Sequence, residues 1–500
     1  MKVTEKPQVV KSVQHASQPS TYDVVILDLF SCNPEGENDT IVHEYLLSKI
    51  LSSLKETGSL WLIANHVRHN MELIPHGFEL AETISKKGFF LRNIITWFIP
   101  NPVIEPQRLT NRYAHLFFFV KDVNSYYFNK DLAREKHIWK DIEWGHRSGR
   151  YHPLGKDPSN VWLQAEDDRK GNITHHIPLS FQDMINRIKL LSLPQDGNIV
   201  IYSDNDIRFD GTSVFPTREL ISLLPLNQKK AKMQNTRKSK VEQKSYRVLH
   251  KSSEIMTELK DGEVDLIVTS PPYWDMKNYG IRGQIGYSES YDAYLSRISV
   301  VWQECYRVLS GDGTFWLNIN TKTHDKTIRM IQYDFIKQCI DIGFRLWDIV
   351  IWHKSVSGPA PANNLTDKFE YVLIFFKNSD FYINTGYANN RCDYRIQALN
   401  TMGNVWNINR LWGSIGKGFP HPAMYPDELI ERILNLATIE GDLVLDPFLG
   451  SGTTLIVAKK LSRSCVGYEI NSDYFSILKK RLYDAKLETL FNLNEDVILT

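Results

Sequence analysis

The sequence predicts an α/β protein in which one domain occurs twice in tandem. Apolar runs typical of buried strands alternate with segments of helical period, which indicates a mainly parallel sheet covered by helices. Several blocks of sequence recur in the same order in the two halves of the 500 residues. A chain of this length is in any case expected to form two or more domains.

The first half shows this alternation element by element. Residues 1–20 are polar and are expected to form a flexible arm. The expected strands are 23–30, 58–65, 94–98 and 115–121, and the expected helices are 42–55 and 80–87.

Internal repetition is the most informative feature of the chain. The recurring blocks keep their order and nearly constant spacing: 58–65 with 313–320, 109–121 with 365–377, 160–162 with 404–406, and 176–188 with 421–433. This pattern predicts the tandem duplication of one domain of roughly 200 to 240 residues.

The duplication sets the expected domain boundaries. We expect a first domain at 21–205, a basic linker at 206–243 and a second domain at 244–500. The linker holds six basic residues and no acidic residue between 229 and 240. Such a run is either a solvated linker or a local contact for a polyanion.

Composition excludes several classes of protein. The net charge of +1 gives no overall field that would attract a polyanion, so any nucleic-acid surface must be local. The five cysteines are scattered without metal-ligand spacing, which argues for a reducing compartment and against zinc or disulfides. The chain shows neither a signal peptide nor a membrane-spanning apolar run. We therefore expect a cytoplasmic protein with no metal and no membrane partner.

An apolar strand at 265–269 ends abruptly in Ser270-Pro271-Pro272-Tyr273. Proline donates no hydrogen bond and fixes its own φ, so the strand must stop there in a rigid loop. Open α/β sheets bind their ligands at the carboxyl ends of the strands, so this loop is expected to face a ligand. The alternative is that the two prolines only end the strand. The first half has Asp28-Leu-Phe-Ser31 at the matching place, without the prolines and the ring. It keeps the strand and lacks the loop.

A second loop joins a strand to a helix in Asp446-Pro-Phe448-Leu-Gly450-Ser451-Gly452-Thr453. Its glycines allow a ligand to approach the backbone at a helix N-terminus. Glu469 ends the next strand 23 residues beyond Asp446, the spacing of an acid that reaches ribose hydroxyls. Leu455 replaces the third glycine of dinucleotide sites, and no Gly-Lys-Ser/Thr follows for ATP. S-adenosylmethionine, a nucleoside without a demanding phosphate site, fits this loop.

These motifs resemble those of the β-arranged amino-methylating (cytosine-N4 and adenine-N6) DNA methyltransferases. Residues 269–274 resemble the catalytic motif, 446–454 the cofactor motif, and 421–429 the segment beside the methionine moiety. The resemblance implies two tandem Rossmann-like S-adenosylmethionine-dependent methyltransferase domains in permuted β order, the N-terminal one degenerate. The chain departs from the family at 251–253, Lys-Ser-Ser, where Gly-Asp-Ser usually holds adenine.

The resemblance also implies the site residues. The catalytic residues would be Ser270, Pro271, Pro272 and Tyr273. The cofactor-binding residues would be Asp446, Phe448, Gly450, Ser451, Gly452, Thr453, Glu469 and His421.

The implied activity is methyl transfer from S-adenosyl-L-methionine to the N4 amino group of a flipped cytosine in duplex DNA. Serine at position 270 is typical of cytosine-N4 enzymes, and adenine N6 is the alternative. Methylation of ring carbon 5 is excluded, because no cysteine of this chain follows a proline. An inert scaffold that binds cofactor and DNA is a further alternative, as is methylation of RNA or of a protein glutamine.

The expected partners follow from the same resemblance. They are double-stranded DNA and a cognate restriction endonuclease of a restriction–modification system, with the protein acting at the nucleoid. The degenerate first copy is expected to replace a second subunit, which would make the chain a pseudo-dimer.

Overall fold

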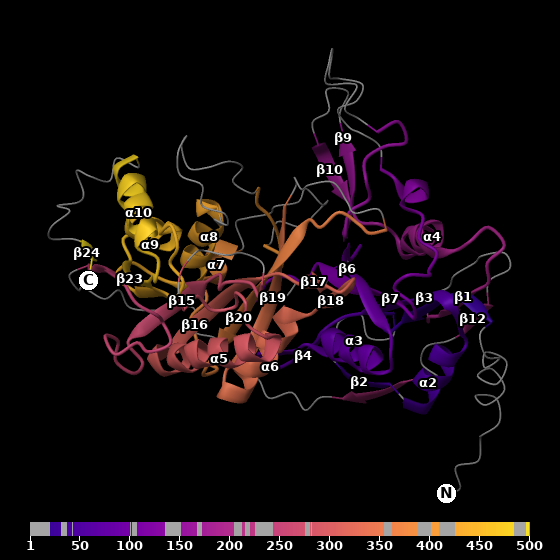
Figure 1. Ribbon diagram of the computed structural model, residues 1–500, viewed down its shortest axis with the longest axis horizontal. Coiled ribbons are helices and arrows are strands. Elements are labelled where there is room, and N and C mark those ends of the chain that lie inside the picture. Colours follow the sequence, from indigo (N-terminus) through magenta and orange to yellow (C-terminus); the bar gives the residue numbers. More distant parts are fainter. Residues whose placement is uncertain are drawn as a thin grey trace, which may run out of the picture.

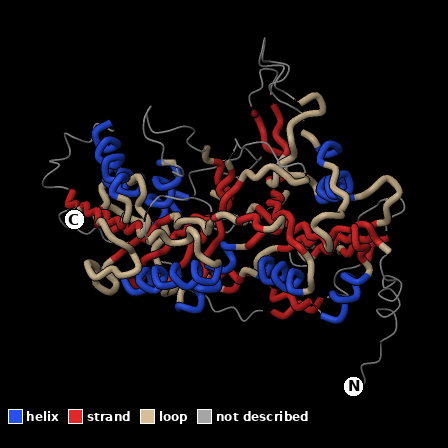
Figure 2. The backbone as a smooth tube through the Cα atoms, in the orientation of Figure 1, coloured by secondary structure: helices blue, strands red, loops and turns tan. Residues whose placement is uncertain are grey.

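The computed structural model describes residues 21–31, 38–42, 44–100, 102, 108–135, 152–167, 173–204, 213–215, 221–225, 244–275, 281, 283–354, 363–388, 402–409, 426–484 and 497–499. Strands form a band across the molecule, and helices lie on both sides of this band (Figure 1, Figure 2). The predicted α/β class is confirmed.

The N-terminal half contains a seven-stranded sheet. Its order is β12 (Ser213–Phe215), β11 (Ile199–Tyr202), β1 (Tyr22–Asp28), β3 (Leu54–Ala64), β7 (Tyr113–Val120), β6 (Phe90–Phe98) and β8 (Val161–Trp162). Strand β7 runs antiparallel to both neighbours, and the other pairs are parallel. The helices are α2 (Glu44–Ser52), α3 (His76–Lys86) and α4 (Phe181–Ser192), with a 3₁₀ turn η1 at Lys130–Ala133.

The C-terminal half contains a nine-stranded sheet. Its order is β21 (Val405–Asn407), β19 (Arg345–His353), β20 (Phe369–Phe376), β16 (Leu309–Ile319), β15 (Val264–Thr269), β22 (Leu443–Asp446), β23 (Ser464–Tyr468), β14 (Tyr246–Leu249) and β24 (Val497–Leu499). Its helices are α5 (Tyr291–Val308), α6 (Ile331–Ile342), α7 (Thr385–Ala388), α8 (Asp427–Ala437), α9 (Thr453–Lys460) and α10 (Ser472–Asp484).

Four two-stranded sheets complete the described structure. They are β2 (Asn38–Val42) with β13 (Ile221–Pro225), β4 (Val67–His69) with β5 (Glu72–Ile74), β9 (Gln164–Asp167) with β10 (Ile173–Ile177), and β17 (Lys322–His324) with β18 (Thr327–Arg329).

The two large sheets share one strand order. The series β8-β6-β7-β3-β1-β11-β12 matches the series β21-β19-β20-β16-β15-β22-β23 strand for strand. Even the register shifts correspond, because the β1–β3 pairing shifts between Tyr22 and Val24 and the β15–β16 pairing shifts between Val264 and Leu266. The C-terminal sheet then continues into β14 and β24, which pair with one another.

Burial explains why these segments form strands and where they end. All eight residues of β7 are buried, as expected for a central strand covered on both faces. The helix expected at 42–55 ends at Ser52, because Leu54 already pairs with Tyr22 in the sheet. Strand β12 extends the first sheet beyond residue 205, and the basic run at 229–240 lies outside the described residues.

Among the described residues, no helix combines the length and the apolar character that crossing a bilayer requires.

Candidate functional site

Two loops of the C-terminal half leave neighbouring strands at the same edge of the sheet. Strands β15 and β22 pair in parallel, with Leu266 opposite Val444 and Ile267 opposite Leu445. The Ser-Pro-Pro-Tyr loop follows β15, and the glycine loop follows β22. Carboxyl ends of parallel strands are the ligand-binding edge of such sheets, so the topology brings the two predicted motifs together.

Asp446 ties the ends of these strands to each other. Its fully buried carboxylate accepts hydrogen bonds from Thr269 Oγ1 at 2.7 Å and from Thr454 Oγ1 at 2.6 Å. The backbone N–H of Phe448 donates to it at 3.0 Å. Asp446 therefore stabilises the conformation of both loops through buried hydrogen bonds. It does not line the pocket between them.

The glycine loop needs its glycines for conformation and for space. Gly450 and Gly452 have φ values of 55° and 81°, which side chains rarely adopt. A Cβ at Gly452 would also lie 2.2 Å from Leu478 Cδ1. From helix α10, Arg481 Nη1 donates to the carbonyl of Ser451 at 2.9 Å and to Thr453 Oγ1 at 2.9 Å. The loop is thus held in one shape at the start of α9.

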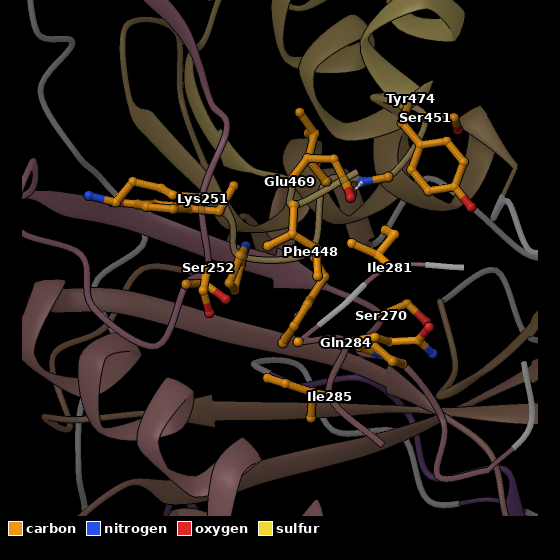
Figure 3. Close-up of a pocket in the computed structure, with 18 of the residues that line it drawn as sticks. Lys251, Ser252, Ser270, Ile281, Gln284, Ile285, Phe448, Ser451, Glu469 and Tyr474 are labelled. Carbon is orange, nitrogen blue, oxygen red and sulfur yellow. Dashed lines mark hydrogen bonds between the residues drawn. The ribbon is translucent and has the colours of Figure 1, made fainter. Parts of the chain in front are cut away.

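An open pocket of about 870 Å³, part of it continuous with solvent, lies between the two loops (Figure 3). Seven of the predicted residues line it: Ser270, Pro272, Phe448, Gly450, Ser451, Thr453 and Glu469. Pro271 and Tyr273 belong to the same loop as Ser270 without lining the pocket, and Gly452 belongs to the glycine loop without lining it. His421 lies outside the described residues.

Glu469 is the acidic group of this pocket. Its carboxylate accepts the N–H of Gly450 at 2.8 Å and the N–H of Asn471 at 2.7 Å. Burial raises the pKa of Glu469 to about 7, although these backbone hydrogen bonds oppose the shift. Its charge therefore changes near neutral pH.

The Ser-Pro-Pro-Tyr loop is fixed by contacts from several elements. Tyr294 on α5 donates its hydroxyl to the carbonyl of Pro272 at 2.9 Å. The indole of Trp274 donates to the carbonyl of Glu289 at 2.9 Å. The hydroxyl of Tyr273 donates to Glu370 Oε2 on β20 at 3.1 Å. The loop is rigid because of these contacts as well as because of its prolines.

Sequence reasoning missed part of the lining. Lys251, Ser252 and Ser253 line the pocket, although they replace the expected Gly-Asp-Ser. Their place directly after β14, at the same sheet edge, is a signal that could have identified them. Gln284 and Tyr474 also line the pocket and belong to no motif, so no sequence signal was available for them. Within the described part of the chain, no cluster of three or more His, Cys, Asp or Glu could hold a metal ion.

A protein-family model matches the chain in both of its halves. Residues 42–211 and 264–480 match the family model described as DNA methylase. The chain is similar to type II methyltransferase M.Cfr9I of Citrobacter freundii, with 31% identity over 260 residues, covering 46% of this chain and 84% of that protein. It is also similar to type II methyltransferase M.HpaI of Haemophilus parainfluenzae, with 31% identity over 242 residues, covering 47% of this chain and 73% of that protein. A solved DNA modification methylase from Thermus thermophilus, complexed with S-adenosyl-L-methionine, is 25% identical with a TM-score of 0.37, covering 51% of this chain and 99% of that chain.

Proposed function

Because the chain belongs to the DNA methylase family, which it matches over residues 42–211 and 264–480, we propose that its C-terminal half, 244–500, methylates cytosine N4 in duplex DNA. One observation carries this proposal. The Ser-Pro-Pro-Tyr loop and the glycine loop leave paired strands and line one pocket. A methyl donor and an amino group can therefore meet between them.

The methyl donor is S-adenosyl-L-methionine, and the lining suits it. The glycine loop offers backbone that a nucleoside can approach closely, and Phe448 offers an apolar surface beside it. We propose that the Glu469 carboxylate accepts hydrogen bonds from the ribose hydroxyls. When bound, the cofactor supplies an electrophilic methyl group.

The Glu469 carboxyl predicts a pH dependence of cofactor binding. A carboxyl with a pKa of about 7 is ionised above that pH and neutral below it. Ribose hydroxyls bind the ionised form better, so affinity is expected to fall as pH drops through 7, by up to about tenfold per pH unit. Titration calorimetry at several pH values measures this. Glu469→Gln is the control, with weaker binding and a flat profile. If Glu469→Gln kept the pH dependence of cofactor affinity, that dependence would arise from another group.

The residues of the Ser-Pro-Pro-Tyr loop would activate the target amino group. The lone pair of the amino nitrogen is conjugated into the ring of the base. The site must therefore accept hydrogen bonds from the amino N–H groups and draw the nitrogen toward tetrahedral geometry. We propose Ser270 Oγ and the carbonyl of Pro271 as these acceptors, with Tyr273 stacked on the flipped base. Fixed acceptors lower the barrier by orientation and electrostatics.

Serine at position 270 favours cytosine N4 as the target, and adenine N6 is the alternative. A neutral hydroxyl suits the more polarised amino group of cytosine. Transfer of tritiated methyl groups to DNA, followed by nucleoside analysis, tests the assignment. We expect label in N4-methylcytosine. Label in N6-methyladenine alone would overturn the choice of base while leaving the reaction class intact.

We further propose that the N-terminal half is a degenerate copy that takes the place of a second subunit. The contacts between the halves support this, because they occur in matched pairs. Thr110 bridges to Gly403, and its repeat equivalent Thr366 bridges to Ser159. Contacts that recur with the two partners exchanged are the property of a two-fold isologous interface.

Two equivalent asparagines close this interface. The N–H of Arg112 donates to Asn404 Oδ1 at 3.0 Å, and the N–H of Lys368 donates to Asn160 Oδ1 at 2.9 Å. Between helices α3 and α6, Lys337 pairs with Glu82 at 2.7 Å. Such an intramolecular pseudo-dimer would hold DNA with both halves and methylate it with one, within a restriction–modification system.

A further inference from the structure

A buried ion pair lies behind the Ser-Pro-Pro-Tyr loop. Lys354 follows strand β19 and Glu370 lies on β20, with side chains exposed by only 4% and 13%. Lys354 Nζ lies 2.9 Å from Glu370 Oε1, and the hydroxyl of Tyr273 donates to Glu370 Oε2 at 3.1 Å. Glu370 therefore connects a buried ammonium to the ring proposed to stack on the target base.

Glu370 is a permanent acceptor for the Tyr273 hydroxyl. Burial alone would raise its pKa, but the charge of Lys354 and hydrogen bonds from Lys354, Tyr273 and Asn318 outweigh burial and leave the pKa below its usual value. The carboxyl is thus ionised at neutral pH. Each of its oxygens then has a donor, which is the condition under which a buried charge is tolerated.

The N-terminal half contains the same backbone positions without this pair. Lys354 N–H donates to the carbonyl of Lys368 at 2.7 Å, and at the matching place Ile99 N–H donates to the carbonyl of Arg112 at 2.9 Å. Ile99 thus stands where Lys354 stands, and its side chain is buried.

The residue of the N-terminal half that is equivalent to Glu370 is also apolar. Trp352 pairs with Glu370 across β19 and β20, and Trp97 pairs with Ala114 across β6 and β7. Ala114 is fully buried. The same strands therefore pack with Ile and Ala in one half and with Lys and Glu in the other.

The fold does not need the ion pair, because the N-terminal half forms the same sheet without it. Replacing a buried ion pair by apolar residues is often neutral or stabilising, so stability does not account for the pair. The pair is present where Tyr273 is present, and both are absent where Ser31 stands in place of that tyrosine. The ion pair and the tyrosine ring thus occur together in one half and are both absent from the other.

We infer that Lys354 and Glu370 are positioning residues that hold the Tyr273 ring in the orientation in which it stacks on the target base. The inference rests on the proposed function. It assigns to the buried pair a role in turnover that acts only through the hydroxyl of Tyr273.

The N-terminal half supplies the test, because its residues can be transplanted. The double variant K354I/E370A is expected to keep the melting temperature and the affinity for S-adenosyl-L-methionine. Its kcat is expected to fall roughly 10- to 100-fold, as for a misoriented group. With 2-aminopurine at the target position of the DNA, fluorescence is expected to rise, because the ring quenches the flipped base less.

Three further variants separate positioning from other effects. Tyr273→Phe removes only the hydroxyl and is expected to lower kcat similarly, with no further loss when combined with K354I/E370A. K354M/E370Q keeps an acceptor for the hydroxyl and is expected to restore part of kcat. R134M/D157A removes an ion pair of similar burial, 7% and 20% exposed at 2.9 Å, together with the pairs that these residues form with Asp131 and Lys130. It is expected to leave kcat unchanged.

The outcomes that contradict the inference are distinct. Wild-type kcat in K354I/E370A, losses that add to those of Tyr273→Phe, or a melting temperature that falls together with kcat would each overturn it. A wild-type chain that transfers no methyl group to any DNA would overturn the proposed function and this inference with it.

Discussion

Alanine in place of Ser270 is expected to lower kcat of DNA methylation by roughly 100- to 1000-fold, the usual effect of removing one fixed hydrogen-bonding group from the reaction centre. Ser270 follows β15 directly and lines the pocket shared with the glycine loop. Affinity for S-adenosyl-L-methionine is expected to change little, since Phe448 and Glu469 provide the main contacts proposed for it. Steady-state kinetics and calorimetry measure the two effects separately.

A matched control is Ser296→Ala on helix α5. The Ser296 hydroxyl donates to the carbonyl of Asp292 at 2.8 Å on the exposed face of the helix. Its loss is expected to leave kcat unchanged. Equal rates for Ser270→Ala and Ser296→Ala would remove Ser270 from the mechanism.

Removal of Asn404 or of Asn160 is expected to destabilise the protein by about 1–3 kcal/mol each, because each leaves a backbone N–H, buried at Arg112 and part-buried at Lys368, without its acceptor. Asn404 also donates to Asn111 Oδ1 at 3.1 Å, and Asn160 donates to Asp367 Oδ1 at 3.0 Å. The two alanine variants should lose similar free energy, because the residues are equivalent in the repeat. Urea denaturation measures the change.

Asn435→Ala is the control for these interface variants. Asn435 donates to the carbonyl of Glu431 at 2.8 Å on the exposed face of α8. Exposed substitutions usually change stability by no more than about 0.5 kcal/mol. Interface variants as stable as Asn435→Ala would mean that the halves are joined by the linker and hardly by their contacts, which contradicts a pseudo-dimer.

The features that could be predicted from the sequence are those with a local pattern. The strand that ends at Ser270 is recognisable because apolar residues lead into two prolines. The glycine loop is recognisable because a strand, two glycines and a helix follow one another. The repeat of 109–121 in 365–377 predicted two similar sheets, and the matching strand orders agree with it.

The remaining features depend on contacts between residues far apart in the chain. Tyr273 and Glu370 are separated by 97 positions, and Arg112 and Asn404 by 292. Arg481 reaches the glycine loop from a helix without any motif. Packing alone decides such pairs, so neither periodicity nor spacing could have indicated them. Element boundaries shifted for the same reason, as at Ser52, where sheet pairing ends the helix early.

The two halves act as an internal comparison of structure with chemistry. They share strand order and register shifts, so these properties follow from the fold. They differ at Ser270, at Tyr273 and at the buried pair behind it, so these properties follow from the reaction that we propose. The N-terminal half thus shows which polar groups are not required for the sheet to form.

The central claim is tested most directly by sequencing DNA, with detection of modified bases, from cells that express either the wild-type chain or Ser270→Ala. The wild-type chain is predicted to modify one short sequence at cytosine N4, and the variant is predicted to leave that sequence unmodified. Unmodified DNA in cells that contain folded, cofactor-binding wild-type protein, or the same modification by Ser270→Ala, would contradict the account.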